Sequence, residues 1–485
     1  MSPAANPIRK TRIVCTIGPA TSSPDLIREL LVSGMDVARI NFSHGTQEEH
    51  ARVIAALRDE ARRLGRELAI LGDLQGPKIR TNDVRGGKLT LETGAELRFI
   101  HSDSECREGL LTTKFAPLVR DSVVGDRILL NDGLLELEVV GKDPAGLTCR
   151  AVRGGPLASR RGINLPKVRL DVPALTDKDR DDVRFALEHD IDFLALSFVR
   201  CAEDILLLRK LIDDAGKGRS VQVVAKIEKP EALENLESIL KSAHAVMVAR
   251  GDLGVELGLE KVPAAQKHII RQAIHHGIPV ITATQMLESM IANPWPTRAE
   301  VSDVANAVFD GTDAIMLSGE TAAGAFPIDT VRMVRSIVAE AEQQGYRNGT
   351  EEFQILDSSS SHLGMSLGKA AAVFADQMGA TAMACMSDTG NAGIRLTAQR
   401  PSVPVYVFSC NLSAVRRMNL VRGAHGILLP EEPPPGHVFP AMERMLLERG
   451  LIHVGDPVVY TAGLSLKRNV TTNTIHLRTT ESPHA

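Results

Sequence analysis

Short strand-like runs alternate with expected helices over the first 77 residues of the chain. Each run is followed by a helix-start signal or by glycine, and the runs occupy residues 10–17, 37–44 and 68–71. Ser23 and Gly34 bound the first expected helix, and Thr46 with Glu49 forms a capping box at the start of the second. Strands that alternate with helices in this way predict parallel strands in an α/β protein.

The rhythm changes after the third run. Segments with strand-like alternation, such as 127–140, are separated by turn signals at Gly86-Gly87 and Asn131-Asp132-Gly133. No convincing helical pattern occurs in this stretch. We therefore predict an inserted lid domain at residues 78–171 that folds as a small β-barrel.

Helical periodicity returns at Thr176, an expected N-cap followed by acidic residues. Five further apolar runs precede expected helices, at residues 193–198, 223–228, 245–249, 279–284 and 314–320. Eight strands, each followed by a helix, predict a catalytic (β/α)8 TIM barrel built from residues 1–77 and 172–345. In this fold the active site lies at the carboxyl ends of the strands.

The pattern beyond the barrel predicts a further domain. Residues 343–361 are polar and contain glycine and serine, which predicts a linker. Strands are then expected at 380–386, 403–408, 426–429, 457–460 and 474–477. This alternation predicts a doubly wound α/β domain at residues 346–485, suited to regulation or to subunit contacts.

Two consecutive strands of the expected barrel end in charged residues. A single helix expected at 230–243 joins them, so the strands should be parallel and adjacent, with Glu228 and Asp252 at one edge beside Lys226. Two carboxylates and an ammonium suit Mg²⁺ and a phosphoryl group, and the alternative is a surface salt-bridge cluster. Gly251 is expected in a glycine-rich loop that approaches a ligand or takes a positive φ.

Other polar residues also fall at expected strand ends, in greater number than loop starts alone would explain. They are Arg39, Asn41, Ser43, Asp73, Ser197, Thr284, Ser318 and Glu320. Asn41, Ser43 and Asp73 offer oxygen ligands for a monovalent cation, or are simply hydrogen-bonded strand termini. No Walker A motif and no GxGxxG after a strand occurs, so a nucleotide has to bind by another route. Basic residues that could contact a nucleotide are Arg39, His44, Arg80 and Lys178. The alternative is that each of them is an ordinary solvent-exposed side chain.

The amino-acid composition mainly excludes classes of function. One Trp and three Tyr, a net charge of −4 and no long basic stretch argue against nucleic-acid binding. Six Cys residues without a CxxC motif form neither a zinc pattern nor a disulfide framework, which suits a reducing compartment. No apolar run approaches membrane-spanning length and the N-terminus lacks an apolar signal region, so we expect a cytoplasmic protein with no membrane partner.

Longer motifs resemble those of the pyruvate kinase family, in the family's order and over nearly the whole chain. These motifs are at residues 38–45, 226–228, 249–256, 283–290, 296–308 and 315–321. The resemblance implies that the chain transfers the phosphoryl group of phosphoenolpyruvate to ADP, which gives pyruvate and ATP in the last step of glycolysis. It also implies dependence on Mg²⁺ (or Mn²⁺) and an allosteric homotetramer.

The resemblance assigns roles to individual residues of this chain. The implied Mg²⁺ ligands are Glu228 and Asp252. The implied groups around the substrate are Arg39 on the phosphate, Lys226 on the phosphoryl group in flight, Gly251, Asp252 and Thr284 on the substrate, and Thr284 with Ser318 near the proton route to the enol carbon. The implied nucleotide contacts are Asn41, Phe42, Ser43, His44, Arg80 and Lys178.

One departure from the family pattern concerns the monovalent cation. The family's cation site maps onto Asn41, Ser43, Asp73 and Leu74. Where potassium-dependent members carry an acid nearby, this chain has Lys78, whose ammonium could replace the charge of the cation. We therefore expect activity without K⁺.

A second departure lies in the C-terminal domain. The family's phosphate-binding loop maps onto Ser387, Asp388, Thr389, Gly390 and Asn391. Asp388 would repel a phosphate, and Asn391 stands where a cation often follows. A sugar-phosphate or nucleotide effector is favoured by the architecture and opposed by these two residues, so its identity is left open.

Two other functions stay open at this point. A Mg²⁺-dependent aldolase-type barrel that acts on pyruvate or phosphoenolpyruvate also uses acids at neighbouring strand ends, but it would need neither the lid nor Lys226. A non-catalytic metabolite sensor would use the C-terminal domain, and the intact set of Lys226, Glu228 and Asp252 argues against it.

Overall fold

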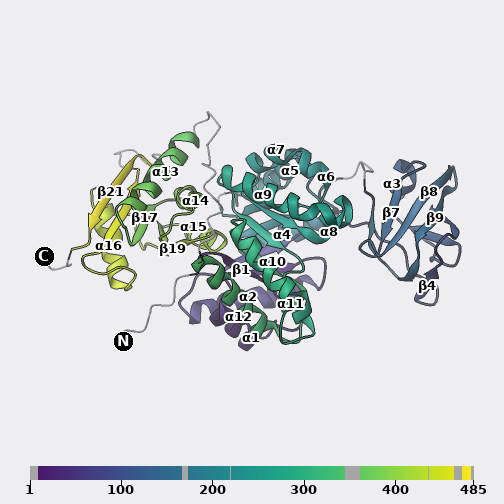
Figure 1. Ribbon diagram of the computed structural model, residues 1–485, viewed down its shortest axis with the longest axis horizontal. Coiled ribbons are helices and arrows are strands. Elements are labelled where there is room, and N and C mark those ends of the chain that lie inside the picture. The colour runs from purple at the N-terminus through teal and green to yellow at the C-terminus, as the bar shows by residue number, and fades with distance from the viewer. Residues whose placement is uncertain are drawn as a thin grey trace.

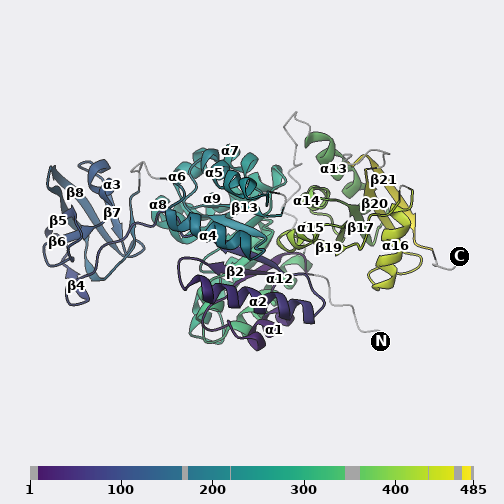
Figure 2. The same cartoon turned by 180° about the vertical axis from the view of Figure 1, so that it is seen from behind.

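The computed structural model describes residues 9–166, 173–218, 220–344, 361–434, 436–463 and 472–481. Three groups of secondary structure lie in a row, with a barrel between a β-rich lid and a C-terminal α/β domain (Figure 1). The reverse view shows the lid and the C-terminal domain at opposite ends of the molecule (Figure 2). The domain bounds at 77/78, 171/172 and 345/346 stay predictions, and the last two fall outside the described residues.

The central body is a closed barrel of eight parallel strands, which confirms the predicted TIM barrel. Its strands are β1 (Arg12–Thr16), β2 (Val37–Asn41), β3 (Ala69–Asp73), β12 (Phe193–Leu196), β13 (Gln222–Ile227), β14 (Ala245–Ala249), β15 (Val280–Ala283) and β16 (Ala314–Leu317). Pairing of Arg12 with Ala314 closes the ring between the first and last strands. The insertion follows β3, as predicted.

The barrel strands are buried on both faces, so their side chains supply two separate apolar layers. The inner layer combines small and large residues, such as Ala195, Ala245 and Met247, which fill the barrel interior. Leu420 of the C-terminal domain belongs to this inner layer and is fully buried. The outer layer packs the strands against the surrounding helices.

Three helices around the barrel begin at the predicted caps Ser23, Thr46 and Thr176. The longer barrel helices are α1 (Pro24–Ser33), α2 (Gln47–Arg63), α4 (Asp177–Glu188), α5 (Ala202–Asp214), α9 (Val262–His275), α10 (Arg298–Phe309) and α12 (Pro327–Gln343). Ser23 caps α1, and Thr46, Thr176 and Thr297 each form a capping box. Short helical turns follow β15 and β16 as η2 (Glu288–Ile291) and α11 (Gly319–Ala322).

Two local predictions in the barrel are wrong. The single helix expected at 230–243 is two helices, α6 (Pro230–Glu234) and α7 (Leu236–Ser242), which meet at Asn235. The expected glycine-rich loop after β14 is instead the helix α8 (Arg250–Leu257), in which Gly251 does not take a positive φ. The first turn of this helix directly follows the end of β14, so the N–H groups of that turn, which have no partner within the helix, lie at the strand ends.

Over residues 78–166, the described part of the lid, there are two sheets and one short helix. A six-stranded sheet has the order β11 (Ile163–Asn164), β7 (Arg127–Leu130), β8 (Leu135–Asp143), β9 (Gly146–Arg153), β5 (Glu96–His101) and β6 (Leu110–Thr113). A separate pair is formed by β10 (Gly155–Ala158) and β4 (Lys88–Leu91). The small barrel expected here is thus divided between two sheets, and the helix α3 (Ala116–Asp121) corrects the expectation of a helix-free insertion.

The C-terminal domain has the predicted doubly wound form. Its sheet order is β19 (Ala424–Leu428), β18 (Val405–Ser409), β17 (Ala382–Met386), β20 (Pro457–Ala462) and β21 (Thr474–Thr479), and β21 is antiparallel. The helices and turn are α13 (Ser361–Gln377), α14 (Asn391–Ala398), α15 (Leu412–Arg417), η3 (Met418–Leu420) and α16 (Val438–Glu448). The linker expected at 343–361 lies almost wholly outside the described residues. Among the helices described, none is long and apolar enough to cross a membrane.

Candidate active site

Three charged side chains meet at the carboxyl end of the barrel. Arg39 Nε on β2 donates to Asp73 Oδ2 on β3 at 2.7 Å, and Lys226 Nζ on β13 lies 3.3 Å from Asp73 Oδ1. Arg39 also donates to the Thr16 hydroxyl of β1 at 2.9 Å. The side chains of Arg39 and Lys226 are 11% and 12% exposed, and that of Asp73 is 2% exposed, so their charges neutralise one another largely out of water.

Lys226 has two further acceptors. Its ammonium donates to Ser197 Oγ at 2.7 Å and lies 2.9 Å from Glu228 Oε1. Glu228 Oε2 accepts the Phe198 N–H at 2.7 Å. Phe198 has φ 55°, a left-handed conformation that large side chains seldom adopt, and such strain is concentrated at functional sites.

The cluster holds its members in defined protonation states. Burial favours the neutral amine of Lys226, but the carboxylates of Asp73 and Glu228 outweigh burial and raise its pKa, so it stays an ammonium. Burial alone would raise the pKa of Asp73, but Lys226 and Arg39 lower it below the ordinary value. Burial raises the pKa of Glu228, and the charge of Asp252 raises it further against the opposing effect of Lys226.

The second predicted carboxylate approaches from the next strand. Asp252 lies in the first turn of α8, close enough to Glu228 for the two charges to repel. Among the residues that the structure describes, no group of three or more His, Cys, Asp or Glu side chains could hold a metal ion. Mg²⁺ is usually held by one or two carboxylates together with substrate phosphates and water, so a two-acid set fits a Mg²⁺ ion bound with a phosphorylated substrate.

Thr284 completes this side of the site. It follows β15 with φ 69°, and its Oγ1 accepts the Gly251 N–H at 3.0 Å. Ser318, after β16, donates its backbone N–H to Glu320 Oε2 at 2.7 Å, and no interaction joins Ser318 to the cluster in the described part of the chain.

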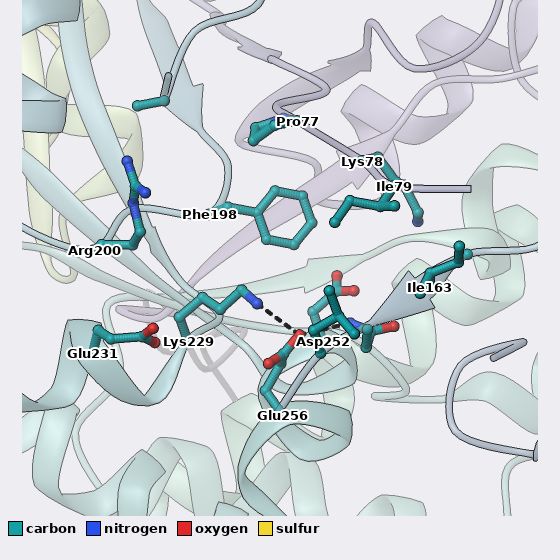
Figure 3. Close-up of a pocket in the computed structure, with 14 residues that line it drawn as sticks. Pro77, Lys78, Ile79, Ile163, Phe198, Arg200, Lys229, Glu231, Asp252 and Glu256 are labelled. Atoms are coloured by element: carbon teal, nitrogen blue, oxygen red, sulfur yellow. Dashed lines mark hydrogen bonds and ion pairs between the residues drawn. The ribbon is translucent and has the colours of Figure 1, made fainter. Parts of the chain in front are cut away.

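A cavity that opens to solvent lies between the lid and the barrel. Its lining residues include Asp252 and Phe198 of the barrel and Pro77, Lys78 and Ile79 from the segment after β3 (Figure 3). A dashed line joins Lys229 to Glu256, whose Oε1 is 2.9 Å from Lys229 Nζ and 3.0 Å from Asn164 Nδ2 of the lid. The lid and barrel therefore share a buried carboxylate beside the cavity.

Four of the predicted nucleotide contacts lie at the end of β2 and just after it, next to the lysine cluster, where the Phe42 N–H donates to the Asp73 carbonyl at 3.0 Å. Asn41 Oδ1 accepts the Ser43 N–H at 3.1 Å, and the His44 N–H donates to the Asn41 carbonyl at 3.3 Å. Lys178 Nζ donates to the Phe42 carbonyl at 2.6 Å, which joins α4 to the loop after β2. Four of these residues thus form one neighbourhood with Lys178. Arg80 instead belongs to the lid, where it donates to the Arg160 carbonyl at 3.2 Å.

The predicted monovalent cation site is only partly assembled. Both Asp73 oxygens are taken by Arg39 and Lys226, and the Leu74 carbonyl accepts the Ser197 hydroxyl at 2.7 Å. Lys78 lines the cavity that contains Asp252.

The predicted effector loop has a cation that the sequence pattern did not reveal. Arg417 at the end of α15 donates to the Thr389 carbonyl at 2.9 Å and to Asn391 Oδ1 at 3.1 Å. Burial lowers the pKa of Arg417 to about 10, and no carboxylate pairs with it among the described residues. The Ser387 hydroxyl accepts the Ala392 N–H at 3.3 Å at the start of α14, and no bond of the Asp388 side chain is recorded in the described region.

Sequence reasoning missed several residues that build the site. Ser197 was singled out only as the end of a strand. No role was assigned to Phe198, whose backbone is left-handed, or to Arg250, which follows β14. Arg250 donates to the Thr284 carbonyl at 2.6 Å. The position of these residues was a usable signal, because all three lie within two residues of the end of a barrel strand.

This arrangement defines a class of protein: a TIM-barrel enzyme with a buried lysine–carboxylate site at the strand ends, covered by a β-rich lid. Residues 8–331 match the family model for the pyruvate kinase barrel domain, and residues 366–477 match that for the pyruvate kinase alpha/beta domain. The chain therefore belongs to the pyruvate kinase family, whose members are phosphotransferases.

Individual relatives agree with the family match. The pyruvate kinase of Geobacillus stearothermophilus is 41% identical over 471 residues, which cover 96% of this chain and 79% of the relative. That of Sporosarcina psychrophila is 39% identical over 481 residues, with 96% and 80% covered. That of Staphylococcus haemolyticus (strain JCSC1435) is 39% identical over 474 residues, with 97% and 80% covered.

Proposed function

We propose that this chain transfers the phosphoryl group of phosphoenolpyruvate to ADP in a Mg²⁺-dependent reaction that yields pyruvate and ATP. The observation that carries the proposal is the buried Lys226 ammonium, held by Ser197, Asp73 and Glu228 at the carboxyl end of the barrel. Phosphoryl transfer needs positioning and charge neutralisation more than covalent help, and a fixed ammonium supplies both.

Each residue has a part that its surroundings support. Lys226 already uses three acceptors, so a phosphoryl oxygen would replace one of them, and the contact with Asp73 at 3.3 Å is the longest. Arg39 adds a second positive charge for the phosphate. The Gly251 backbone and the Thr284 hydroxyl would orient the carboxylate end, and Ser318 with Thr284 would serve the proton route to the enol carbon.

Glu228 and Asp252 would hold Mg²⁺ (or Mn²⁺), which when bound supplies Lewis-acid neutralisation of the phosphoryl oxygens. The repulsion between these two carboxylates supports this assignment, because a shared cation relieves it. Asn41, Phe42, Ser43, His44, Arg80 and Lys178 would contact the nucleotide. Lys78 would take the place of K⁺ at the site of Asn41, Ser43, Asp73 and Leu74.

Family membership also supports proposals about assembly and regulation. We infer a cytoplasmic homotetramer, which light scattering of the purified protein would test. The Arg417 guanidinium against Thr389 and Asn391 supports an anionic effector, such as a sugar phosphate or a nucleotide, at residues 387–391.

Replacement of Lys226 tests the proposed reaction. With phosphoenolpyruvate, ADP and Mg²⁺, the wild-type protein is expected to form ATP, and Lys226→Met is expected to lower kcat about 1000-fold because one preorganised cation is lost. Lys210→Met is the matched control, since Lys210 is an exposed lysine paired with Asp214 at 2.9 Å on α5, and its kcat should not change. Wild-type protein that forms no ATP but cleaves or condenses pyruvate would favour the aldolase-type function, and full turnover by Lys226→Met would refute the assigned role.

A further inference from the structure

The turn after β15 holds two consecutive residues in a conformation that side chains disfavour. Thr284 has φ 69° and Gln285 has φ 54°, and neither residue is glycine. A left-handed conformation is least tolerated by a β-branched residue such as threonine, and each such residue costs about 1–3 kcal/mol. The turn therefore persists only where surrounding groups hold it in place.

Arg250, the first residue of α8, makes contacts that can hold this turn. Its Nη2 donates to the Thr284 carbonyl at 2.6 Å and to the Gln285 carbonyl at 3.4 Å, and its Nε donates to the Ala283 carbonyl at 3.1 Å. On the other side, Nη1 lies 2.8 Å from the Asp303 carboxylate of α10. The Arg250 side chain is only 12% exposed, so these charged hydrogen bonds are largely shielded from water.

The same turn carries a group of the proposed site. The Thr284 hydroxyl accepts the Gly251 N–H at 3.0 Å, and Gly251 directly follows Arg250 and precedes Asp252. We propose that Arg250, fixed by Asp303, is a positioning residue that sets the Thr284 hydroxyl and the Gly251 backbone for the carboxylate end of the substrate. This inference rests on the proposed function only for the identity of that substrate.

Lysine cannot reproduce this arrangement. The guanidinium is a rigid planar group that donates to three successive carbonyls while it pairs with Asp303, whereas an ammonium is a point charge on a flexible chain. Arg250→Lys keeps the charge beside the site but loses the fork of donors. It therefore separates positioning from simple electrostatics.

The test compares Arg250→Lys and Asp303→Asn with the control Arg332→Lys, which alters an exposed arginine paired with Asp329 on α12. Both test variants are expected to raise KM for phosphoenolpyruvate about 10-fold, equivalent to about 1.4 kcal/mol, with KM for ADP unchanged. A residue with a merely structural role would lower the fraction of folded enzyme and leave both KM values as they are. Arg332→Lys should match wild type.

Two further measurements keep the proposal independent of turnover. Amide hydrogen exchange of residues 283–287 should be faster in Arg250→Lys than in wild type. Gln285→Gly, added to Arg250→Lys, should recover part of the lost affinity for phosphoenolpyruvate, because glycine adopts the left-handed conformation without a clamp.

The outcomes are distinguishable. If the wild-type protein does not turn over, the proposed reaction fails, and exchange at 283–287 alone decides whether Arg250 holds the turn. Unchanged exchange in Arg250→Lys overturns the inference in either case. Unchanged KM for phosphoenolpyruvate in an active Arg250→Lys enzyme also overturns it.

Discussion

Lys226 is positioned by groups from three different strand ends. Ser197 follows β12, Glu228 follows β13 and Asp73 ends β3, and all three accept from its ammonium or lie beside it. An ammonium buried without such partners would lose its proton, because burial lowers the pKa of lysine. The charge required for phosphoryl transfer is thus maintained by the geometry of the barrel rather than by the lysine alone.

Replacement of Lys78 tests the expected independence from K⁺. Wild-type protein is expected to keep its activity in a buffer that contains neither K⁺ nor Na⁺, because Lys78 brings a fixed positive charge to the cavity that Asp252 also lines. Lys78→Glu should create a K⁺ requirement, seen as an activation of about 10-fold by KCl, since one site charge is reversed.

The control for Lys78→Glu is Lys88→Glu, which reverses an exposed lid charge and should leave the salt response of the wild type. The measurement is the reaction rate of each variant as a function of KCl concentration at constant ionic strength. A strict K⁺ requirement of the wild-type protein would contradict the prediction.

His425 gives a prediction about stability and pH. Its Nε2 is buried without a hydrogen-bond partner in the described structure, and burial lowers the pKa of His425 to about 3, with a further lowering by Arg12 and Arg9 against the opposing effect of Asp36. The unfolded chain binds this proton below its ordinary pKa of 6.5, whereas the folded chain binds it only below about 3. Stability is therefore lost as the pH falls from 6.5 toward 3, by about 2 kcal/mol at pH 5.

Thermal unfolding between pH 7 and pH 5 measures this effect. His425→Gln should show a smaller decrease in Tm over that interval than wild type, since glutamine does not titrate. An equal decrease in both proteins would show that His425 is protonated in the folded state.

Secondary-structure elements whose ends are marked by capping residues agree with the sequence predictions, whereas an element that depends on tertiary contacts does not. Ser23, Thr46 and Thr176 cap helices as predicted, because a cap depends on residues next to one another in sequence. The helix α8 was predicted as a loop, because its two glycines disfavour a helix that tertiary contacts nevertheless stabilise.

The same distinction applies within the site. Glu228 and Asp252 were found from strand ends, since the topology of parallel strands fixes which ends meet. The left-handed Phe198 and Thr284, and the Arg417 guanidinium against Asn391, depend on contacts between segments far apart in sequence. No local pattern records such contacts.

The capping box of α4 has a role beyond its helix. Asp179 Oδ2 accepts the Thr176 N–H at 2.9 Å, and its Oδ1 accepts the Gly76 N–H at 3.0 Å just before the lid begins. Asp179 is fully buried, so Asp179→Ala should leave the Gly76 N–H unsatisfied and destabilise the protein by about 2–3 kcal/mol.

Glu49→Ala is the matched control for Asp179→Ala, because Glu49 occupies the same place in the exposed capping box of α2. Glu49→Ala should lower the free energy of unfolding by about 1 kcal/mol. Urea unfolding followed by circular dichroism compares the two variants, and equal midpoints would contradict a role of Asp179 outside its helix.

The two outer parts of the molecule both contact the barrel. The lid and the C-terminal domain lie on opposite sides of the barrel (Figure 1). Asn164 of the lid contacts Glu256 of α8, whereas Leu420 of η3 belongs to the inner layer of the barrel. The strand β1 connects the two regions: Arg12 Nε donates to the Val421 carbonyl at 3.0 Å, and Thr16 accepts from Arg39 at 2.9 Å. One short strand therefore contacts both the C-terminal domain and Arg39 of the site.

Arg400 provides a test of how firmly the C-terminal domain is attached. Its Nη1 is 2.9 Å from Asp313 Oδ1 at the start of β16, and the Asp313 and Arg400 side chains are 4% and 18% exposed. Arg400→Met should lower the free energy of unfolding by about 3 kcal/mol, because Asp313 stays buried without its cation. Asp313 remains attached to the barrel, since its carboxylate accepts the Val280 N–H at 3.1 Å. Calorimetry should then show the C-terminal domain unfolding before the barrel, as a separate transition. Arg444→Met, which removes an exposed arginine of α16, should leave the wild-type profile. An unchanged profile in Arg400→Met would mean that the other contacts between the two domains, such as those of Leu420, Arg12 and Arg416, are sufficient to hold them together.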